Sequence, residues 1–263
     1  MVVVKGQDPA RNVRAALDRL GGIGHFVTRT DRVLVKPNVG WDRTVAQAAN
    51  TNPAVVAEIV RACQSAGAKE VWVCDCPVND PERCFRRSGI REAAERAGAR
   101  VVLPTEAKAL DVRLSADFGV LPVLAPFVQA TKIINVPVAK DHGSARITAG
   151  MKNWIGITQR ERSRFHRSLD ESIASLALLM RPTLTVVDAT RVLVRNGPQG
   201  GNLADVRQMD MLAISVDPVA LDAWVADLLG ARLSDVEYLH LAATKKLGQI
   251  DYKKLGIAQI TAG

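Results

Sequence analysis

The chain has 263 residues, of which 48% are hydrophobic and 24% are charged. These proportions are typical of a globular protein with a sizeable core, and they argue against intrinsic disorder. The formal net charge of +8 favours anionic partners, but an aromatic content of 4% is too low for base-stacking surfaces, so a nucleic-acid partner is not expected.

No run of about 18 apolar residues is present, so no membrane-spanning helix is expected. The first residues, Met1-Val2-Val3-Val4-Lys5-Gly6, lack the pattern of a secretory signal peptide. We therefore expect a soluble protein that is cytoplasmic as written. The alternative is an exported protein whose leader has been removed.

The first half of the chain alternates between expected helices and strands. Asp8-Pro9 joins a capping carboxylate to a proline at the first helical position, which predicts a helix that ends at Gly21-Gly22. Further helices are predicted from Asn52-Pro53 and Asp80-Pro81. Strands are expected at 32–35, 70–74 and 100–103, and the first should stop before Pro37. This β-α-β-α-β order predicts a parallel sheet.

The second half is less regular. Strands are expected at 132–136, 183–187 and 211–216, and helices at 169–180, from Asp217-Pro218 to near Gly230, and from Ser234-Asp235. Residues 137–168 are expected to form a long functional loop with a short helix, and the tail from Gly256 an edge strand. We expect residues 1–263 to form a single α/β unit, with a mostly parallel or mixed sheet flanked by helices and room for two lobes around a central cleft.

Five expected strands run directly into polar residues. In open α/β sheets, ligands bind in the crevice outside the carboxyl ends of the strands, so these residues are expected to gather around one cleft. The alternative is that loops at strand ends are simply polar. The residues are Lys36 and Asn38, then Cys74, Asp75 and Cys76, then Lys140, Asp141 and His142, then Asp188 and Arg191, and last Asp217 and Asp222.

Residues 140–153 strengthen this hypothesis, because glycines let backbone N–H groups approach an anion and lysine and arginine supply positive charge. Neither a Walker A pattern nor a G-x-G-x-x-G motif is present, so no nucleotide-binding motif is identified. Lys36, Lys140 and Lys152 are expected to neutralise an anion, and Asn38 and Asn153 to orient it. Arg146, Asp188 and Asp222 are added to the expected ligand-binding residues.

The expected catalytic residues are His142, Lys140 and Asp217. His142 is expected to act as general acid or base, and Asp188 and Asp217 to hold a divalent metal or to orient the lysines. The basic run 160–167 is either a solvated surface or a lid over the anion. Its histidine, His166, is then a further ligand-binding candidate.

Three cysteines, Cys74, Cys76 and Cys84, form a C-x-C-x7-C pattern that matches neither a zinc ribbon nor a ferredoxin run. They can ligate a metal or an iron–sulfur cluster if a fourth ligand is found elsewhere. The alternatives are buried thiols, or one disulfide between Cys76 and Cys84. Cys63 lies in a helical pattern and is expected in the core.

Several motifs in order resemble the bacterial and archaeal family called domain of unknown function 362, over about 33–230. Many relatives carry an added ferredoxin-like segment with clustered cysteines; this chain lacks a C-x-x-C-x-x-C run, which weakens an electron-transfer role. Some relatives carry a twin-arginine leader, which is absent here. The motifs are Val33-Leu34-Val35-Lys36-Pro37-Asn38, Thr51-Asn52-Pro53, Ile134-Asn135-Val136-Pro137 with Lys140 and His142, Lys152-Asn153-Trp154-Ile155-Gly156, Asp188-Ala189-Thr190-Arg191, Asn196-Gly197-Pro198 and Asp217-Pro218-Val219-Ala220 with Asp222.

The resemblance implies no particular activity. The first hypothesis is therefore an enzyme that binds a phosphate- or carboxylate-bearing small molecule in a cleft lined by lysine, histidine, asparagine and aspartate. One alternative is a metal or iron–sulfur redox protein that uses Cys74, Cys76 and Cys84. The other is a non-catalytic module that binds an anion. Nothing in the sequence indicates an oligomeric state.

Overall fold

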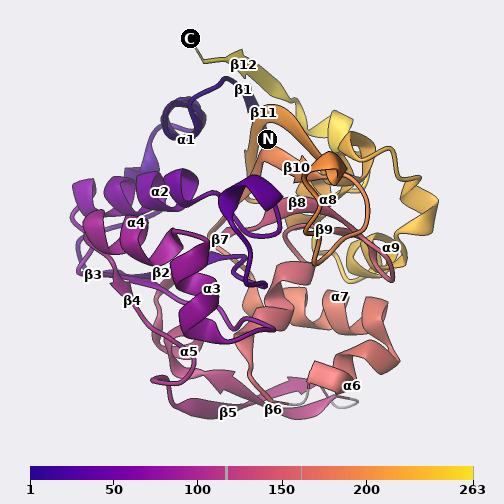
Figure 1. Cartoon of the computed structure of the whole chain (residues 1–263), viewed down its shortest axis with the longest axis horizontal. Coiled ribbons are helices and arrows are strands. Elements are labelled where there is room, and N and C mark those ends of the chain that lie inside the picture. Colours follow the sequence, from indigo (N-terminus) through magenta and orange to yellow (C-terminus); the bar gives the residue numbers. More distant parts are fainter. Residues whose placement is uncertain (116–117, 161, 263) are drawn as a thin grey trace.

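The computed structural model describes residues 1–115, 118–160 and 162–262. Its centre is a ten-stranded sheet in which eight strands follow the order β12-β1-β11-β10-β7-β2-β3-β4, while β8 pairs with β10 and β9 with β8. A separate hairpin of β5 and β6 lies at one end of the molecule (Figure 1). The strands are β1 (Val2–Lys5), β2 (Arg32–Pro37), β3 (Glu70–Val73), β4 (Arg100–Val101), β5 (Ala109–Ser115), β6 (Gly119–Leu124), β7 (Lys132–Val136), β8 (Val138–His142), β9 (Arg146–Thr148), β10 (Leu184–Leu193), β11 (Val206–Ser215) and β12 (Ala258–Thr261).

Most neighbouring strands in the large sheet are parallel. The pairs β2–β3, β3–β4, β2–β7, β7–β10, β8–β10 and β1–β12 are parallel. The pairs of β11 with β1 and with β10, and the pair β8–β9, are antiparallel. The expected α/β class with a mostly parallel sheet is therefore confirmed.

Helices cover both faces of the sheet (Figure 1). One core cluster packs α1, α2, α3 and α4 against one face, and the other packs α5 to α9 against the opposite face. The helices are α1 (Pro9–Arg19), α2 (Pro53–Ser65), α3 (Pro81–Arg87), α4 (Ile90–Arg96), α5 (Ala125–Gln129), α6 (Arg162–Arg167), α7 (Leu169–Met180), α8 (Pro218–Leu228) and α9 (Glu237–Thr244), with short 3-10 helices η1 (Ile23–His25), η2 (Val45–Gln47), η3 (Lys152–Ile157), η4 (Leu203–Asp205), η5 (Leu233–Asp235) and η6 (Tyr252–Leu255).

Strand alternation decides which face each side chain enters. In β2, Val33 and Val35 belong to the core under α1 to α4, whereas Leu34 belongs to the core under α5 to α9. Lys36 has the same parity as Leu34, so its buried side chain lies on the face that carries η3 and α7. This parity places the lysine beneath the cleft described below.

Four helices begin with the same local device, a carboxylate or amide cap followed by proline. Asp8, Asn52, Asp80 and Asp217 accept hydrogen bonds from N–H groups of the first turns of α1, α2, α3 and α8. The predicted helix starts are confirmed at these positions. Their regularity explains why the helices were the best predicted elements.

Several expectations were wrong in detail. β2 includes Pro37, and residues 137–168 contain β8, β9, η3 and α6 rather than one long loop. The expected last long helix is divided into η5 and the short α9, and the hairpin β5–β6 was not anticipated. The consequential error concerns β11, which runs antiparallel to β10, so its carboxyl end lies at the opposite edge of the sheet from those of β2, β3 and β7.

Within the described residues, none of the helices is both long and apolar enough to cross a membrane. This agrees with the expectation from the sequence.

Candidate functional site

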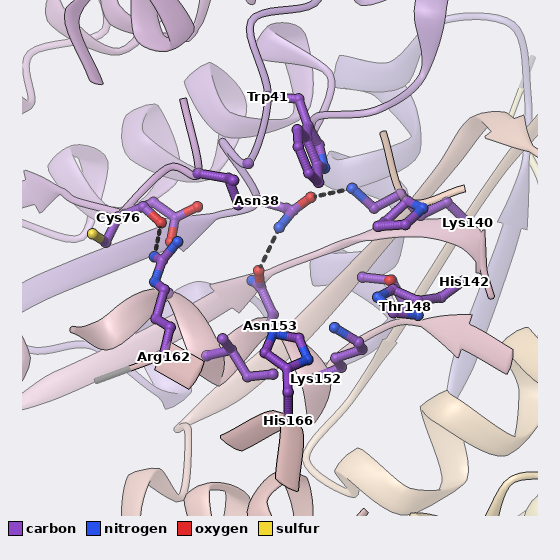
Figure 2. A pocket seen from close by; sticks show the side chains of 16 residues that line it. Asn38, Trp41, Cys76, Lys140, His142, Thr148, Lys152, Asn153, Arg162 and His166 are labelled. Carbon is purple, nitrogen blue, oxygen red and sulfur yellow. Dashed lines mark hydrogen bonds between the residues drawn. The ribbon is translucent and has the colours of Figure 1, made fainter. Parts of the chain in front are cut away.

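A cavity of about 330 Å³ opens at the carboxyl ends of β2 and β3, beside the β8–β9 hairpin. Figure 2 shows Trp41, Asn38 and Lys140 on one side of it and Lys152, Asn153 and His166 on the other. The loops after β2 and β3, the hairpin, η3 and α6 all contribute. The lining residues are Asn38, Gly40, Trp41, Asp75, Cys76, Val78, Lys140, His142, Thr148, Lys152, Asn153, Ile155, Gly156, Arg162, His166 and Pro198.

The floor of the cavity is a buried ion pair. The Lys36 ammonium donates to Asp75 Oδ1 at 2.6 Å and to Asn153 Oδ1 at 3.0 Å. The second oxygen of Asp75 accepts the backbone N–H of Val39 at 2.6 Å. Burial lowers the pKa of Lys36 and the neighbouring Asp75 charge opposes that shift. The one carboxylate among the lining residues is thus already paired.

Asn153 links this floor to the next strand. Its Oδ1 also accepts from Asn38 at 3.0 Å, and its Nδ2 donates to Asn135 Oδ1 at 2.8 Å. Asn135 in turn donates to the Gly150 carbonyl at 2.9 Å. The side-chain amides of Asn38, Asn153 and Asn135 thus form one hydrogen-bonded network. This network fixes η3 relative to β7 and to the end of β2.

Lys140 lies in the middle of β8 and is 1% exposed. Its Nζ donates to Asn38 Oδ1 at 2.8 Å and to the Ala49 carbonyl at 2.5 Å. Burial, with the positive charge of Lys152 as the next cause, lowers the pKa of Lys140 to about 7. Both causes favour the neutral amine of Lys140 more than in an ordinary lysine.

His142 is oriented by its own hairpin. Its Nδ1 accepts the backbone N–H groups of Ser144 at 3.2 Å and Ala145 at 3.1 Å. An Nδ1 that accepts must be unprotonated, so the hydrogen of the neutral ring is on Nε2. Burial and then the charge of Lys152 lower the pKa of His142 to about 3, which keeps the ring neutral.

Lys152 and α6 add positive charge at the mouth. Among the described residues, the Lys152 ammonium has no hydrogen-bond or ion-pair partner, and burial lowers its pKa to about 8. The Arg162 guanidinium donates to the carbonyls of Thr158, Pro77 and Cys76. His166 lies four residues later on the same face of α6 and also lines the cavity. Of the basic run 160–167, Glu161 lies outside the described residues.

Sequence reasoning did not single out Trp41, Thr148 or Arg162 as lining residues. Trp41 lies in the loop after β2, where Asn50 accepts its backbone N–H at 3.0 Å. Thr148 is 4% exposed, and its hydroxyl has no hydrogen-bond partner among the described residues. Arg162 was considered only as a member of the basic run. No sequence motif marks Trp41 or Thr148, since both are placed by loop and hairpin geometry.

The structure places several predicted residues away from the cavity. Asp217 caps α8 and accepts the Gln249 backbone N–H at 2.9 Å, at the opposite edge of the sheet, so the expected catalytic placement of Asp217 is wrong. Asp188, in β10, accepts hydrogen bonds from the backbone N–H of Asn52 and from the hydroxyl of Thr190. Arg146 is exposed and has a left-handed backbone, with φ of 63°, so strand alternation does not carry it to the face of Thr148.

Asp222 does not line the cavity, but it binds the backbone of the segment that precedes η3. Its carboxylate accepts the backbone N–H groups of Gly150 at 2.7 Å and Met151 at 3.1 Å, and the Tyr238 hydroxyl at 3.2 Å. Burial raises the pKa of Asp222 to about 7. Asp222 thus positions the start of η3, and with it Lys152 and Asn153, without lining the cavity.

The cysteines do not form the expected ligand set. Cys74 and Cys76 lie in the core under α5 to α9, whereas Cys84 lies in the core on the other face of the sheet. All are buried free thiols, including Cys63, and burial raises the pKa of Cys76 to about 11. In the described part of the chain, no three histidine, cysteine or acidic residues are grouped to hold a metal ion. The metal site predicted at Cys74, Cys76 and Cys84 is therefore wrong, as is the disulfide alternative.

The chain is similar to known proteins. Residues 33–227 match the family described as Domain of unknown function (DUF362). The chain belongs to this family. The match includes β2, β3, β8, η3 and α6, and therefore every described element that lines the cavity. The resemblance seen in the sequence motifs is thus confirmed.

The DUF362 chain also resembles individual proteins. It is 29% identical over 260 residues to a Synechocystis protein named as thylakoid-associated, which covers 90% of this chain and 74% of that protein. Among solved structures, the lactate racemase apoprotein of Thermoanaerobacterium thermosaccharolyticum is 13% identical with a TM-score of 0.42, and the match covers 73% of this chain and 50% of the racemase. A Thermotoga maritima protein is 11% identical with a TM-score of 0.43, covering 90% and 60%. This chain spans only about half of the length of these two solved proteins.

Proposed function

We propose that this DUF362 protein is an enzyme that binds a phosphate- or carboxylate-bearing small molecule in the cavity. One observation carries the proposal: Lys152 faces the cavity without a partner among the described residues, while Asp75, the lining carboxylate, is paired with Lys36. Arg162 adds further positive charge. An oxyanion is the ligand that such a set of cations attracts.

The neutral donors around the cavity support the same ligand. His142 presents Nε2–H, and the Thr148 hydroxyl is buried without a partner in the part of the chain that the structure describes. Buried polar groups are normally hydrogen-bonded, so a ligand with several acceptor oxygens would complete the hydrogen bonding of this surface. A cationic ligand would leave these donors unsatisfied and would be repelled by Lys152.

The shape of the cavity favours a ligand with more than an anionic group. Its volume lies at the lower end of the range for small-molecule sites. Trp41, Val78 and Ile155 form an apolar part of the lining. We infer that an apolar or planar portion of the ligand contacts Trp41 while its anionic group faces Lys152.

A panel of anions tests this function by thermal unfolding in a low-salt buffer without phosphate. Inorganic phosphate, phenyl phosphate and a dicarboxylate are expected to raise the Tm of the wild type, because a ligand of the native state stabilises it. Lys152→Met should lose this increase. Lys69→Met changes the net charge equally at an exposed site and should keep it. Equal Tm increases in the two variants would show that the anions bind elsewhere.

A non-catalytic anion-binding module would give the same panel result. What separates the two functions is a group in the cavity that can exchange a proton with the bound molecule. Lys140 and His142 are the candidates for that group, and their hydrogen bonds support different roles for them.

A further inference from the structure

We infer that Lys140 is the group that exchanges a proton with the bound molecule, and that His142 is a fixed hydrogen-bond donor rather than the acid or base. The inference rests on the proposed anion site, and it reverses the roles that the sequence suggested for these two residues. It follows from the hydrogen-bond partners of Lys140 Nζ and His142 Nδ1 and from the charges around Lys140.

Lys140 has acceptors for two hydrogens. Asn38 Oδ1 and the Ala49 carbonyl lie at 2.8 and 2.5 Å from Nζ. These two acceptors leave one tetrahedral position on Nζ, which holds the lone pair of the neutral amine and the third hydrogen of the ammonium form. Among the described residues, no third partner occupies that position, and the side chain lines the cavity.

His142 has the opposite arrangement. Two backbone N–H groups point at Nδ1, at 3.2 and 3.1 Å, and they can donate only to an unprotonated nitrogen. A proton on Nδ1 would point at the backbone N–H groups of Ser144 and Ala145, and these three donors would repel one another. The ring is therefore restricted to offering Nε2–H, which suits an oxygen on which negative charge develops.

The charges around Lys140 favour its neutral form. Lys36 of β2, Lys152 of η3, and Arg162 and His166 of α6 are basic, whereas Asp75 is the one acidic residue of this lining and is paired with Lys36. Burial of the amine acts in the same direction and places the pKa of Lys140 at about 7. A base with a pKa near the working pH is the most effective proton acceptor.

The resulting step is a proton transfer. The Lys140 amine takes a proton from an O–H or C–H bond of the bound molecule and gains its third N–H. The electron pair of the broken bond stays on the bound molecule, whose new negative charge is faced by His142 Nε2–H and the Lys152 ammonium. The reverse step returns the proton. No oxidant or reductant is required.

Nuclear magnetic resonance of the whole chain tests this inference without a known substrate. With 13C-labelled lysine, the signal that disappears in Lys140→Met should titrate near pH 7 in the wild type. With 15N-labelled histidine, the His142 ring should remain the Nε2–H tautomer from pH 5 to 8. A Lys140 titration above pH 9.5, or protonation of His142 Nδ1 in this range, would overturn the inference.

Two measurements keep the test decisive. If Lys140→Met does not fold, competitive acetylation of wild-type lysines at different pH values, read by mass spectrometry, gives the titration of Lys140 directly. Binding of inorganic phosphate is measured in parallel. Phosphate binding with Lys140 titrating above pH 9.5 would retain the anion site and remove the proton transfer. A Lys140 titration near pH 7 without phosphate binding would contradict the proposed anion site, and with it the transfer to a bound anion, while retaining the neutral Lys140 amine.

Discussion

The Lys36 ammonium lies 2.6 Å from the Asp75 carboxylate, and neither side chain is more than 2% exposed. This pair occupies the one carboxylate of the cavity lining and leaves the charge of Lys152 uncompensated. Lys36→Met should destabilise the protein by about 3–5 kcal/mol, because it leaves Asp75 buried without a counter-charge. Urea unfolding measures this loss.

Lys245 provides the matched control for this prediction. Its bond to Glu171 at 2.9 Å is partly exposed, and exposed pairs contribute about 0–1 kcal/mol. Lys245→Met should therefore change the free energy of unfolding little. If Lys36→Met cost no more than Lys245→Met, the buried pair would not have the structural role described here.

Gly156 allows close contact between η3 and the buried pair. A Cβ at this position would lie 2.1 Å from Asp75 Oδ1 and 3.0 Å from Lys36 Nζ. Gly156→Ala should cost about 1–3 kcal/mol by overpacking and should weaken anion binding. At Gly24 a Cβ would meet no atom within 4 Å, so Gly24→Ala should affect neither. Calorimetry and urea unfolding of both variants measure anion affinity and stability. A Gly156→Ala variant that binds the anion as tightly as the wild type would contradict the predicted contact.

Asp222 is expected to affect binding without touching the ligand. Asp222→Asn would set an amide N–H against the backbone N–H of Gly150 or Met151, which should displace η3 and lower anion affinity. Asp227, also in α8, accepts the Tyr252 hydroxyl at 2.7 Å rather than the backbone N–H groups before η3. Asp227→Asn is thus a matched control with wild-type affinity. Equal affinities for the two variants would show that Asp222 does not position Lys152.

Lys140 should make stability depend on pH. Its pKa is lowered from 10.5 to about 7 in the native state, so between these values the unfolded chain binds the extra proton. Stability from this group is therefore fully present above pH 10.5 and lost as the pH falls through 7. Between pH 7.5 and 9.5, the free energy of unfolding should rise more steeply in the wild type than in Lys140→Met, by about 1.4 kcal/mol per pH unit. Parallel slopes in urea unfolding would contradict the buried lysine.

The sequence predicted the helices and the parallel strands well, because proline caps and apolar runs are local signals. It could not predict the direction of β11, since strand periodicity is the same in parallel and antiparallel pairs. That error alone placed Asp217 in the predicted site. Three of the five expected strand ends, those after β2, β3 and β7, do meet at the cavity.

Other residues depended on geometry that has no sequence pattern. Arg146 does not line the cavity, because its left-handed backbone directs the side chain elsewhere. Trp41 lines the cavity from the loop after β2. Cys74 and Cys84 are ten residues apart in sequence yet lie on opposite faces of the sheet. Likewise, the roles of Lys140 and His142 could be separated only once their hydrogen-bond partners were known.

Calorimetric titration with inorganic phosphate at low salt, comparing the wild type with Lys152→Met, tests the central claim most directly. We predict one phosphate per wild-type chain and an affinity at least about tenfold weaker in Lys152→Met, since a charge-assisted hydrogen bond contributes about 1.5–3 kcal/mol. Equal affinity in the two proteins, or no phosphate binding by the wild type, would contradict an anion site in this cavity.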